Sequence, residues 1–303
     1  MPSHRGSFRK AAALTPIAVV ANPSSGSADS DVLRSVRAVV SALGPVELTV
    51  PPSAERFRDD VVDAASRSDL LVVAGGDGTL NLVVDALAER LGDVVLGLVP
   101  MGTGNDLART LGIPDDPVRA AHSLVKGRDR ALDLGRARGP NVDRLFANAC
   151  IGGFPVEMNQ AIDADLKRRL GPAAFWVGGA KAAVKLERTV VRMNSVEVPD
   201  CLAVGVGNGR TSGGGIPVWP SARVDDGLLE GCALGAHDHA AAARLALKLK
   251  SGEHAELEGV VTTRARTITI DSDPPIEINV DGELVGLMTP ATFEIVDRFK
   301  LRF

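Results

Sequence analysis

The feature that constrains this chain most is a Gly-Gly-Asp-Gly-Thr segment at residues 75–79. The apolar run before it, residues 70–73, predicts a buried strand. After it, apolar residues recur at the spacing of one helix face, at Leu80, Val83, Val84, Leu87 and Leu91. A glycine-rich turn between a strand and a helix exposes backbone N–H groups, and a helix N-terminus favours a phosphate. The alternative is an ordinary turn in which Thr79 only caps the helix.

Asp77 is the unusual member of this segment, because a carboxylate repels a phosphate unless a cation lies between them. The pattern therefore indicates a nucleotide that carries Mg²⁺, with Asp77 as one contact of the metal. No G-x-x-x-x-G-K-[ST] motif is present, which excludes a P-loop enzyme. The segment that begins at Gly102 starts a dinucleotide fingerprint, but Leu107 stands where the third glycine belongs, so hydride transfer is not supported.

Strand-like and helical segments alternate four times between residues 17 and 111. This alternation predicts an α/β domain with a doubly wound, mostly parallel sheet. Ligands of such sheets bind at the carboxyl ends of the strands. Three of the four predicted strands end in turns of small and polar residues, at 22–26, 75–79 and 102–106. We therefore expect one binding site where these turns meet.

The pattern changes from about residue 131 onward, where short strand-like runs dominate. We expect these strands near 145–151, 189–198, 202–206, 228–234, 260–263, 267–270 and 276–280. Helical stretches are expected near 156–187 and 238–250. The second half thus predicts a β-rich, antiparallel, sandwich-like domain. The expected division is 15–130 for the α/β nucleotide-binding domain and 131–290 for the β-rich domain, with a segment 291–303 that could return to the first domain.

Composition narrows the class of protein. The 303 residues include 45% hydrophobic and 24% charged residues, which is ordinary for a globular protein. A net charge of −4 provides no case for nucleic acid as a partner. The three cysteines, Cys150, Cys201 and Cys232, form no paired metal motif and suit a reducing compartment. The cysteines therefore favour a cytoplasmic protein. Because no apolar run approaches the roughly 18 residues of a membrane span, we also expect no transmembrane segment.

Two Asp-Gly pairs in the second half are candidates for acidic site residues. Asp281 follows the strand at 276–280 on its polar face, and Glu283 lies two residues further on. Such carboxylates suit a general base, yet Asp-Gly between apolar strands is equally a strong hairpin signal, and the two interpretations are compatible. Asp226-Gly227 has the same two interpretations: it could form an ordinary turn, or Asp226 could bind a metal.

Taken together, these motifs resemble the diacylglycerol kinase catalytic-domain family, in particular its soluble bacterial lipid kinases. The matching segments are Asn22-Pro23-Ser24-Ser25-Gly26, Gly75-Gly76-Asp77-Gly78-Thr79 with Asn81, and residues 100–109, followed by Gly213-Gly214-Gly215, Asp226-Gly227-Leu228 and Asp281-Gly282-Glu283. The Gly-Gly-Asp-Gly-Thr element alone also occurs in NAD kinases, sphingosine kinases and phosphofructokinases. With the Gly-Thr-Gly-Asn-Asp stretch it is specific for the lipid kinase branch, and the resemblance covers residues 16–303.

The resemblance implies ATP-dependent phosphorylation of a lipid hydroxyl, with diacylglycerol as the expected acceptor and Mg²⁺ as the metal. It also implies peripheral association with a membrane surface, and it leaves a homodimer open. The expected nucleotide site comprises Asn22, Pro23, Ser24, Ser25, Gly26, Thr49, Gly75, Gly76, Asp77, Gly78, Thr79, Asn81, Gly102, Thr103, Gly104, Asn105 and Asp106. The proton acceptor is expected to be Asp281 or Glu283. A structural magnesium is expected on Asp226 and on the backbone carbonyls of Arg223 and Leu228.

Leu82 departs from the family pattern, which has glutamate at this position. On the predicted helix, position 82 lies opposite the apolar stripe, so core packing does not explain a leucine there. Either a neighbouring group takes over the role of the acid, or the nucleotide site is weakened. Leu82 therefore motivates one alternative, a non-catalytic member that binds lipid or nucleotide. A separate alternative is an NAD kinase-like phosphotransferase, although no Thr-Pro-Thr-Gly-Ser-Thr-like segment supports it.

Overall fold

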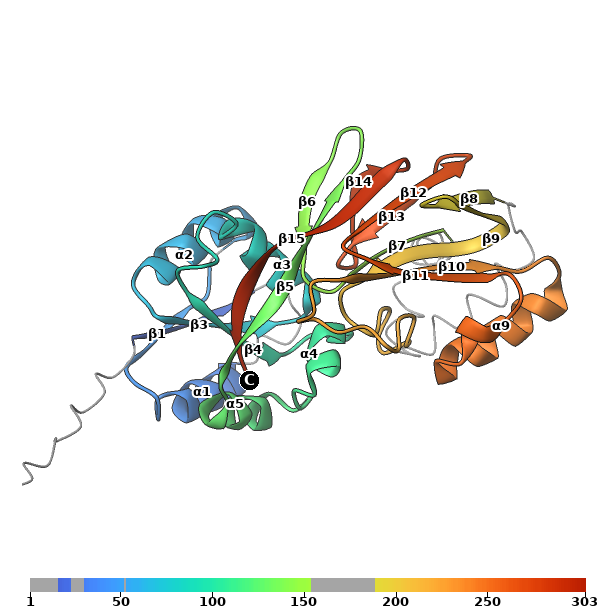
Figure 1. The fold of residues 1–303 in the computed structure, drawn as a ribbon. Helices are drawn as coiled ribbons and strands as arrows, with labels where there is room; N and C mark the ends of the chain where they lie inside the picture. The colour runs from blue at the N-terminus through green and yellow to red at the C-terminus, as the bar shows by residue number, and fades with distance from the viewer. Residues whose placement is uncertain (1–15, 23–29, 52, 154–188) are drawn as a thin grey trace, which may run out of the picture.

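The computed structural model describes residues 16–22, 30–51, 53–153 and 189–303. An α/β part, drawn in blue to green, and a β-rich part, drawn in yellow to red, lie side by side (Figure 1). Two long strands, β5 (Asp129–Arg138) and β15 (Ala291–Arg302), run from one part into the other and pair antiparallel along their length. The two parts are therefore joined through a backbone ladder as well as through side chains.

The α/β part contains four parallel strands in the order β2-β1-β3-β4, and β15 pairs parallel with β4 at its edge. Helices α1 and α5 pack together on one face of this sheet, and α2 and α3 pack together on the other (Figure 1). The elements are β1 (Ile17–Ala21), α1 (Ser30–Val40), β2 (Val46–Thr49), α2 (Ala54–Ser66), β3 (Leu70–Gly75), α3 (Asp77–Ala86), β4 (Val95–Pro100), α4 (Asp106–Leu111) and α5 (Pro117–Lys126). The predicted doubly wound α/β domain is confirmed.

The apolar stripe of α3 and of the turn that follows it lies in the core of this part, as its spacing predicts. Leu80, Val83, Val84, Leu87 and Leu91 are all buried. Leu82 is half-buried and packs against the edge of the same core. The expectation that core packing does not explain Leu82 is therefore wrong in part, because a helix between a sheet and further strands contacts neighbours on more than one side.

The β-rich part consists of antiparallel strands in the order β14-β13-β7-β9-β8-β12-β15, and β10 and β11 extend from β9. The elements are β6 (Asp143–Phe146), β7 (Ala149–Gly153), β8 (Thr189–Met193), β9 (Val196–Gly207), β10 (Leu229–Gly235), α9 (His239–Ser251), a 3₁₀ turn (His254–Glu256), β11 (Val260–Ala265), β12 (Thr267–Asp273), β13 (Glu277–Val280) and β14 (Glu283–Met288). The predicted antiparallel, β-rich second domain is confirmed.

Two predicted strands are in fact pairs of strands. The run 145–151 divides into β6 and β7, because the backbone N–H groups between them turn toward the carboxylate of Asp281. The run 189–198 divides into β8 and β9 at Asn194, whose φ of 54° lies in the left-handed region that suits a turn. The helix expected at 156–187 lies outside the described residues.

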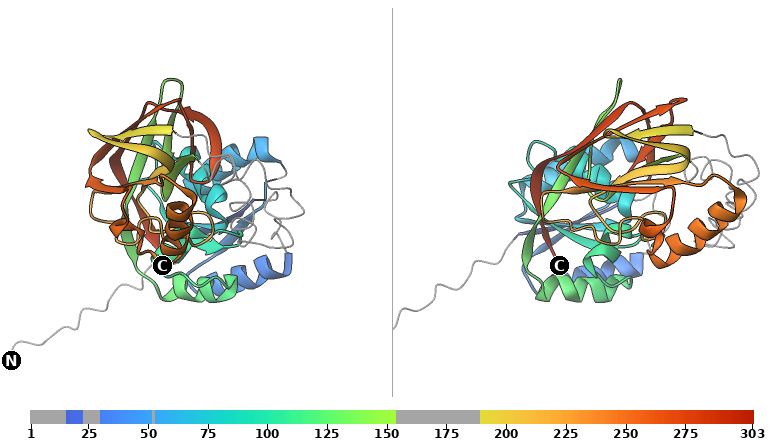
Figure 2. Two further views of the ribbon diagram at one scale, coloured as in Figure 1. Left: turned by 90° about the vertical axis from the view of Figure 1, so that its right-hand side faces the viewer. Right: turned by 45° about the vertical axis from the view of Figure 1, so that its right-hand side comes forward.

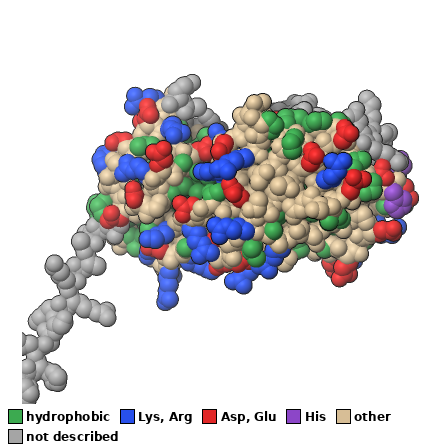
Figure 3. All heavy atoms as spheres, turned by 45° about the horizontal axis from the view of Figure 1, so that its top comes forward, with side chains coloured by type: hydrophobic (Ala, Val, Ile, Leu, Met, Phe, Trp, Pro, Cys, Tyr) green, Lys and Arg blue, Asp and Glu red, His purple; other side chains and the backbone are tan. Residues whose placement is uncertain are grey.

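Residues 291–303 connect both sheets, because β15 pairs with β12 at one end and with β4 at the other. Figures 1 and 2 place α9 at the outer end of the β-rich part. On the face drawn in Figure 3, acidic side chains are scattered over the surface, and basic side chains predominate along the lower edge of the left half of the view. Within the described ranges, no helix has the length and apolar character needed to cross a membrane.

Candidate active site

The glycine-rich turns meet at one edge of the parallel sheet. Strand register places Ala21 beside Ala74, and Gly75 beside Pro100, so the ends of β1, β3 and β4 are neighbours. The turns after β3 and β4 are in backbone contact, since a Cβ atom on Gly102 would lie only 2.6 Å from the Cα atom of Gly76. Glycine is therefore required there for the two turns to touch.

Asp77 connects these two turns. Its carboxylate accepts hydrogen bonds from the backbone N–H groups of Asp106, at 3.0 Å, and Leu107, at 3.2 Å, and so caps α4. Burial raises the pKa of Asp77 to about 6, and the charges of Asp106 and Asp281 act in the same direction, while the two hydrogen bonds oppose it. A cation beside Asp77 would relieve this accumulation of negative charge.

Asn105 and Asp106 hold the loop at 102–106 in shape. The Asn105 side chain accepts a hydrogen bond from the Gly102 N–H, at 3.0 Å, and donates one to the Gly102 carbonyl, at 2.8 Å. The Asp106 carboxylate accepts hydrogen bonds from the N–H groups of Gly214, at 2.9 Å, and Gly215, at 2.7 Å. These two residues therefore organise the loop and attach it to the β-rich part.

Asp281 occupies the turn of the β13–β14 hairpin, as the hairpin interpretation predicted. Both Asp281 and Gly282 have positive φ, of 47° and 87°, and Val280 pairs with Glu283. Its buried carboxylate accepts four hydrogen bonds, three from the N–H groups of residues 147–149 and one from the Asn81 side chain at 3.0 Å. Burial raises the pKa of Asp281, and the hydrogen bonds act against that rise. With four donors already bound, this carboxylate anchors α3 to the β-rich part.

Glu283 reaches the glycine-rich turn from the opposite part of the molecule. A Cβ atom on Gly78 would lie 3.2 Å from Glu283 Oε1, so the carboxylate fills the space beside that glycine. Burial raises the pKa of Glu283, the nearby Arg144 guanidinium lowers it, and the charges of Asp281 and Asp85 raise it. Arg144 is itself held by an ion pair with Asp85 on α3. A half-buried carboxylate thus borders the nucleotide turn.

The remaining predicted nucleotide residues lie at different depths. Thr79 is buried beneath Gly75, and a Cβ atom on Gly75 would lie 2.5 Å from the Thr79 Cβ. Thr103 is exposed, whereas Thr49 at the end of β2 and Asn22 after β1 are half-buried. Gly104 lies against Asp77, since a Cβ atom there would be 3.1 Å from Asp77 Oδ2. Pro23, Ser24, Ser25 and Gly26 lie outside the described residues.

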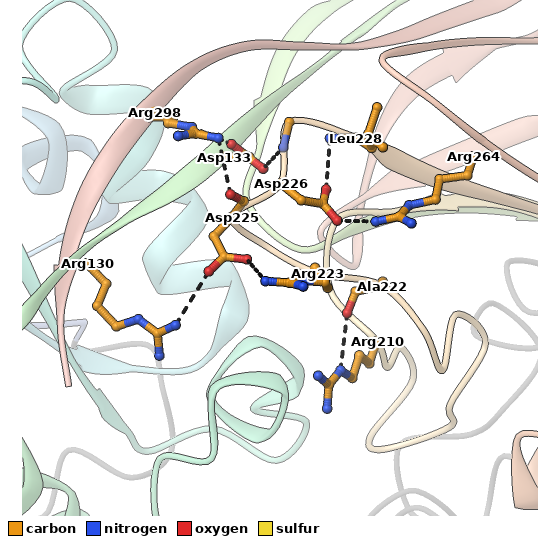
Figure 4. A network of polar contacts seen from close by, with 11 residues as sticks. Arg130, Asp133, Arg210, Ala222, Arg223, Asp225, Asp226, Leu228, Arg264 and Arg298 are labelled. Atoms are coloured by element: carbon orange, nitrogen blue, oxygen red, sulfur yellow. Dashed lines mark hydrogen bonds and ion pairs between the residues drawn. The ribbon is translucent and has the colours of Figure 1, made fainter.

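Residues 223–228, which we call the aspartate turn, lie in a network of arginines and aspartates (Figure 4). One oxygen of Asp226 accepts a hydrogen bond from the Leu228 N–H at 3.0 Å, and the other forms an ion pair with Arg264. The donor set needed for a magnesium ion at Asp226, Arg223 and Leu228 is therefore not available, because a guanidinium occupies the carboxylate. The described residues do not fit that metal.

A nucleotide-linked magnesium at Asp77 is a different case. No group of three or more His, Cys, Asp or Glu side chains within the described ranges is arranged to hold a metal. Mg²⁺ commonly takes one or two carboxylates and fills its remaining positions with phosphate oxygens and water. Asp77, whose carboxylate lies close to the negative charges of Asp106 and Asp281, fits such an ion.

The sequence patterns missed Arg144, Asp85, Asp133, Arg264 and Arg298. Each lies in a segment that reads as an ordinary charged strand or helix, and none belongs to a short motif. Asp133 is completely buried, and it accepts hydrogen bonds from Gly227 N–H at 2.6 Å and Arg298 Nε at 2.7 Å. The one signal in the sequence that could have identified Asp133 is its position between two leucines on β5, where an apolar residue is expected.

Comparisons with known proteins agree with this geometry. Residues 16–137 match the diacylglycerol kinase catalytic domain, and residues 151–299 match the YegS C-terminal NAD kinase beta sandwich-like domain. A Stenotrophomonas maltophilia protein named "Probable lipid kinase YegS-like" is 38% identical over 241 residues, which covers 77% of each chain. A protein of the same name from Xanthomonas campestris is 33% identical over 270 residues, covering 85% of this chain and 86% of the relative.

A crystal structure of a diacylglycerol kinase from Bacillus anthracis superposes with a TM-score of 0.69 at 23% identity, covering 94% of this chain and 96% of that one. At this identity the likeness concerns the fold. The shared fold is an α/β part with glycine-rich turns that faces a β-rich part. The match of the first part to the diacylglycerol kinase catalytic domain, together with the curated relatives, gives the class as a lipid kinase. The chain belongs to the YegS-like lipid kinases of the diacylglycerol kinase catalytic-domain family.

Proposed function

We propose that this protein transfers the γ-phosphate of ATP to a lipid hydroxyl, with diacylglycerol as the acceptor and phosphatidic acid as the product. The observation that carries the proposal is the position of Glu283 against Gly78, which brings a carboxylate of the β-rich part to the nucleotide turn. Family membership supports the kinase class, and the curated relatives are named lipid kinases. The choice of diacylglycerol rests on the family name of the first domain.

Phosphoryl transfer requires mainly that the reactants are positioned and that charge is neutralised. The N–H groups of the first turn of α3 and of the loop at 102–106 would bind the phosphates. Asp77 would hold the Mg²⁺ that accompanies ATP, and the ion would supply charge neutralisation at the phosphates. Asp77 also sets the position of α4, so its role is both structural and electrostatic.

Glu283 is the proposed general base. It would accept the proton of the lipid hydroxyl as that oxygen forms a bond to the γ-phosphorus and the bond to the β-bridging oxygen breaks, releasing ADP. Asp281 is less suited, because its two oxygens already accept four hydrogen bonds. Burial raises the pKa of Glu283 above its ordinary value, which makes the carboxylate a stronger base than an exposed one. The acceptor lipid would reach it from a membrane surface.

The proposal is tested with radiolabelled ATP and Mg²⁺ on vesicles that carry diacylglycerol, sphingosine, ceramide, phosphatidylglycerol or undecaprenol, with soluble NAD as a separate acceptor. We expect transfer to diacylglycerol, and we expect Glu283→Gln to lower kcat by about 10²–10⁴-fold with an unchanged Tm. Glu197→Gln is the matched control. Glu197 lies on β9, is exposed, and forms an ion pair with Arg192 on β8.

Each outcome has a defined meaning. Wild-type turnover in Glu283→Gln would overturn the assignment of the base. Transfer to another lipid would change the proposed acceptor but leave the protein a lipid kinase. Transfer to NAD alone would replace the proposed lipid kinase activity with that of an NAD kinase. ATP-dependent thermal stabilisation without transfer to any acceptor would favour a non-catalytic member, the interpretation that Leu82 motivates.

A further inference from the structure

We propose that the guanidinium groups of Arg264 and Arg298 hold the aspartate turn in place of a divalent cation. The turn would then keep its conformation without bound metal, and the protein would need a divalent cation only for its nucleotide. The proposal concerns folding of the β-rich part and stands whether or not the chain phosphorylates diacylglycerol.

The contacts of Asp226 are the first support. This side chain is 17% exposed and comes from the β9–β10 connection, while Arg264 extends from β11. The guanidinium forms an ion pair with Asp226 Oδ2, and its Nε lies 4.0 Å from Glu230 Oε1. Because the Leu228 N–H occupies Asp226 Oδ1, a protein donor meets each oxygen of the carboxylate. Arg264 therefore stands where a cation bound by Asp226 would have to lie.

Arg298 holds the turn from its other side (Figure 4). Its Nε donates to the buried Asp133 carboxylate at 2.7 Å, and its Nη2 donates to the Asp225 carbonyl at 3.2 Å. The second Asp133 oxygen accepts the Gly227 N–H at 2.6 Å. The turn backbone is thus bound directly to β15 and β5, the two strands that connect both parts of the molecule.

The charges around the turn are balanced. Four arginines meet four carboxylates there: Arg130, Arg223, Arg264 and Arg298 with Asp133, Asp225, Asp226 and Glu230. A divalent cation gains binding energy from carboxylates whose charge is not neutralised. At this turn it would instead meet the repulsion of the guanidinium groups, so the electrostatics oppose metal binding.

The position of the turn relates it to the active site. It ends the segment 208–228, whose beginning touches the α/β part through Arg210 N–H and Thr110 Oγ1 at 3.0 Å. Gly214 and Gly215 of the same segment bind the Asp106 carboxylate. Arg264 and Arg298 are therefore positioning residues for a segment that contacts the nucleotide loop.

The test measures thermal unfolding of the full chain without nucleotide, in EDTA and in excess MgCl₂. The wild type should have the same Tm in both. Arg264→Met removes the guanidinium, should lower Tm in EDTA by about 2–4 °C, and should gain a Mg²⁺-dependent rise because Asp226 becomes free to bind the ion. Arg192→Met is the matched control: Arg192 is 54% exposed against 48% for Arg264, and it also pairs with two acids, Glu197 and Asp271.

A wild-type Tm that falls in EDTA and recovers with MgCl₂ would overturn the proposal, and this measurement requires no variant. An Arg264→Met protein that unfolds like Arg192→Met, without a response to Mg²⁺, would overturn it as well. Failure of the kinase assay would leave both measurements unchanged, so the two proposals can fail separately.

Discussion

The two Asp-Gly turns of the β-rich part begin from the same dipeptide and acquire different surroundings. Asp281 is bound by neutral donors, three backbone N–H groups and the Asn81 amide, whereas Asp226 is bound by one N–H group and a guanidinium. The first turn consequently brings Glu283 to the nucleotide turn, and the second supports the segment 208–228, which contacts the nucleotide loop. The partner of an aspartate, and not the turn it occupies, decides which role it can have.

The largest expected effect comes from neutralising each aspartate. In Asp281→Asn the new NH₂ group would face backbone N–H donors, so we expect a loss of about 2–4 kcal/mol in the free energy of unfolding and a strong loss of kcat. Asp226→Asn keeps an oxygen for the Leu228 N–H and should cost about 1 kcal/mol with little change in kcat. Urea unfolding and the radiolabelled assay measure both, and equal losses would remove the distinction between the turns.

The glycines of the two turns should behave alike. Gly282 and Gly227 have φ of 87° and 77°, so alanine at either position should cost about 1–2 kcal/mol through backbone strain. Gly92→Ala is the control, because it has no positive φ and a Cβ atom there would meet nothing within 4 Å. Chemical denaturation provides the values, and a much larger loss at Gly227 would mean that the aspartate turn depends on packing as well.

The pH dependence of the reaction should respond to charge beside one turn only. If Glu283 is the base, kcat/KM rises with pH as its carboxyl loses a proton, at a pH above the ordinary range because burial raises its pKa. Arg144→Met removes a group that lowers this pKa, so the low-pH side of the kcat/KM profile should move to higher pH. Arg223→Met, at the aspartate turn, should leave the profile unchanged, and a shift in both variants would indicate a general charge effect.

The smallest expected difference between the two turns is in how salt changes the stability cost of replacing each aspartate. The pair of Asp226 and Arg264 is partly exposed, so sodium chloride should screen it and reduce the cost of Asp226→Asn by less than about 1 kcal/mol. The cost of Asp281→Asn should stay constant, because its partners are neutral and buried. Unfolding of both variants at low and high salt checks this, and a constant cost for Asp226→Asn would indicate that its ion pair contributes little.

Much of the fold could be predicted from local patterns. Three features depend on residues that are close in sequence: the glycine-rich turns, the alternation of strands and helices, and the apolar stripe of α3. Local sequence is therefore enough to predict them. The divisions at residues 147–148 and at Asn194 were missed, because the polar interruptions there, Asn148 and Asn194-Ser195, are short enough to fit within continuous strands. At the first division, the backbone leaves the strand because Asp281, more than 130 residues away, binds its N–H groups.

The sequence by itself determined the α/β and β-rich organisation, the glycine-rich turns and the two Asp-Gly turns, because backbone conformation follows local residue type. Only the tertiary structure decided which group faces each carboxylate. Asn81 and Asp281 are 200 positions apart, Arg298 and Asp133 are 165 apart, and Arg264 and Asp226 are 38 apart. Such pairs form only when elements that are distant in the sequence pack together, and no short pattern encodes that packing.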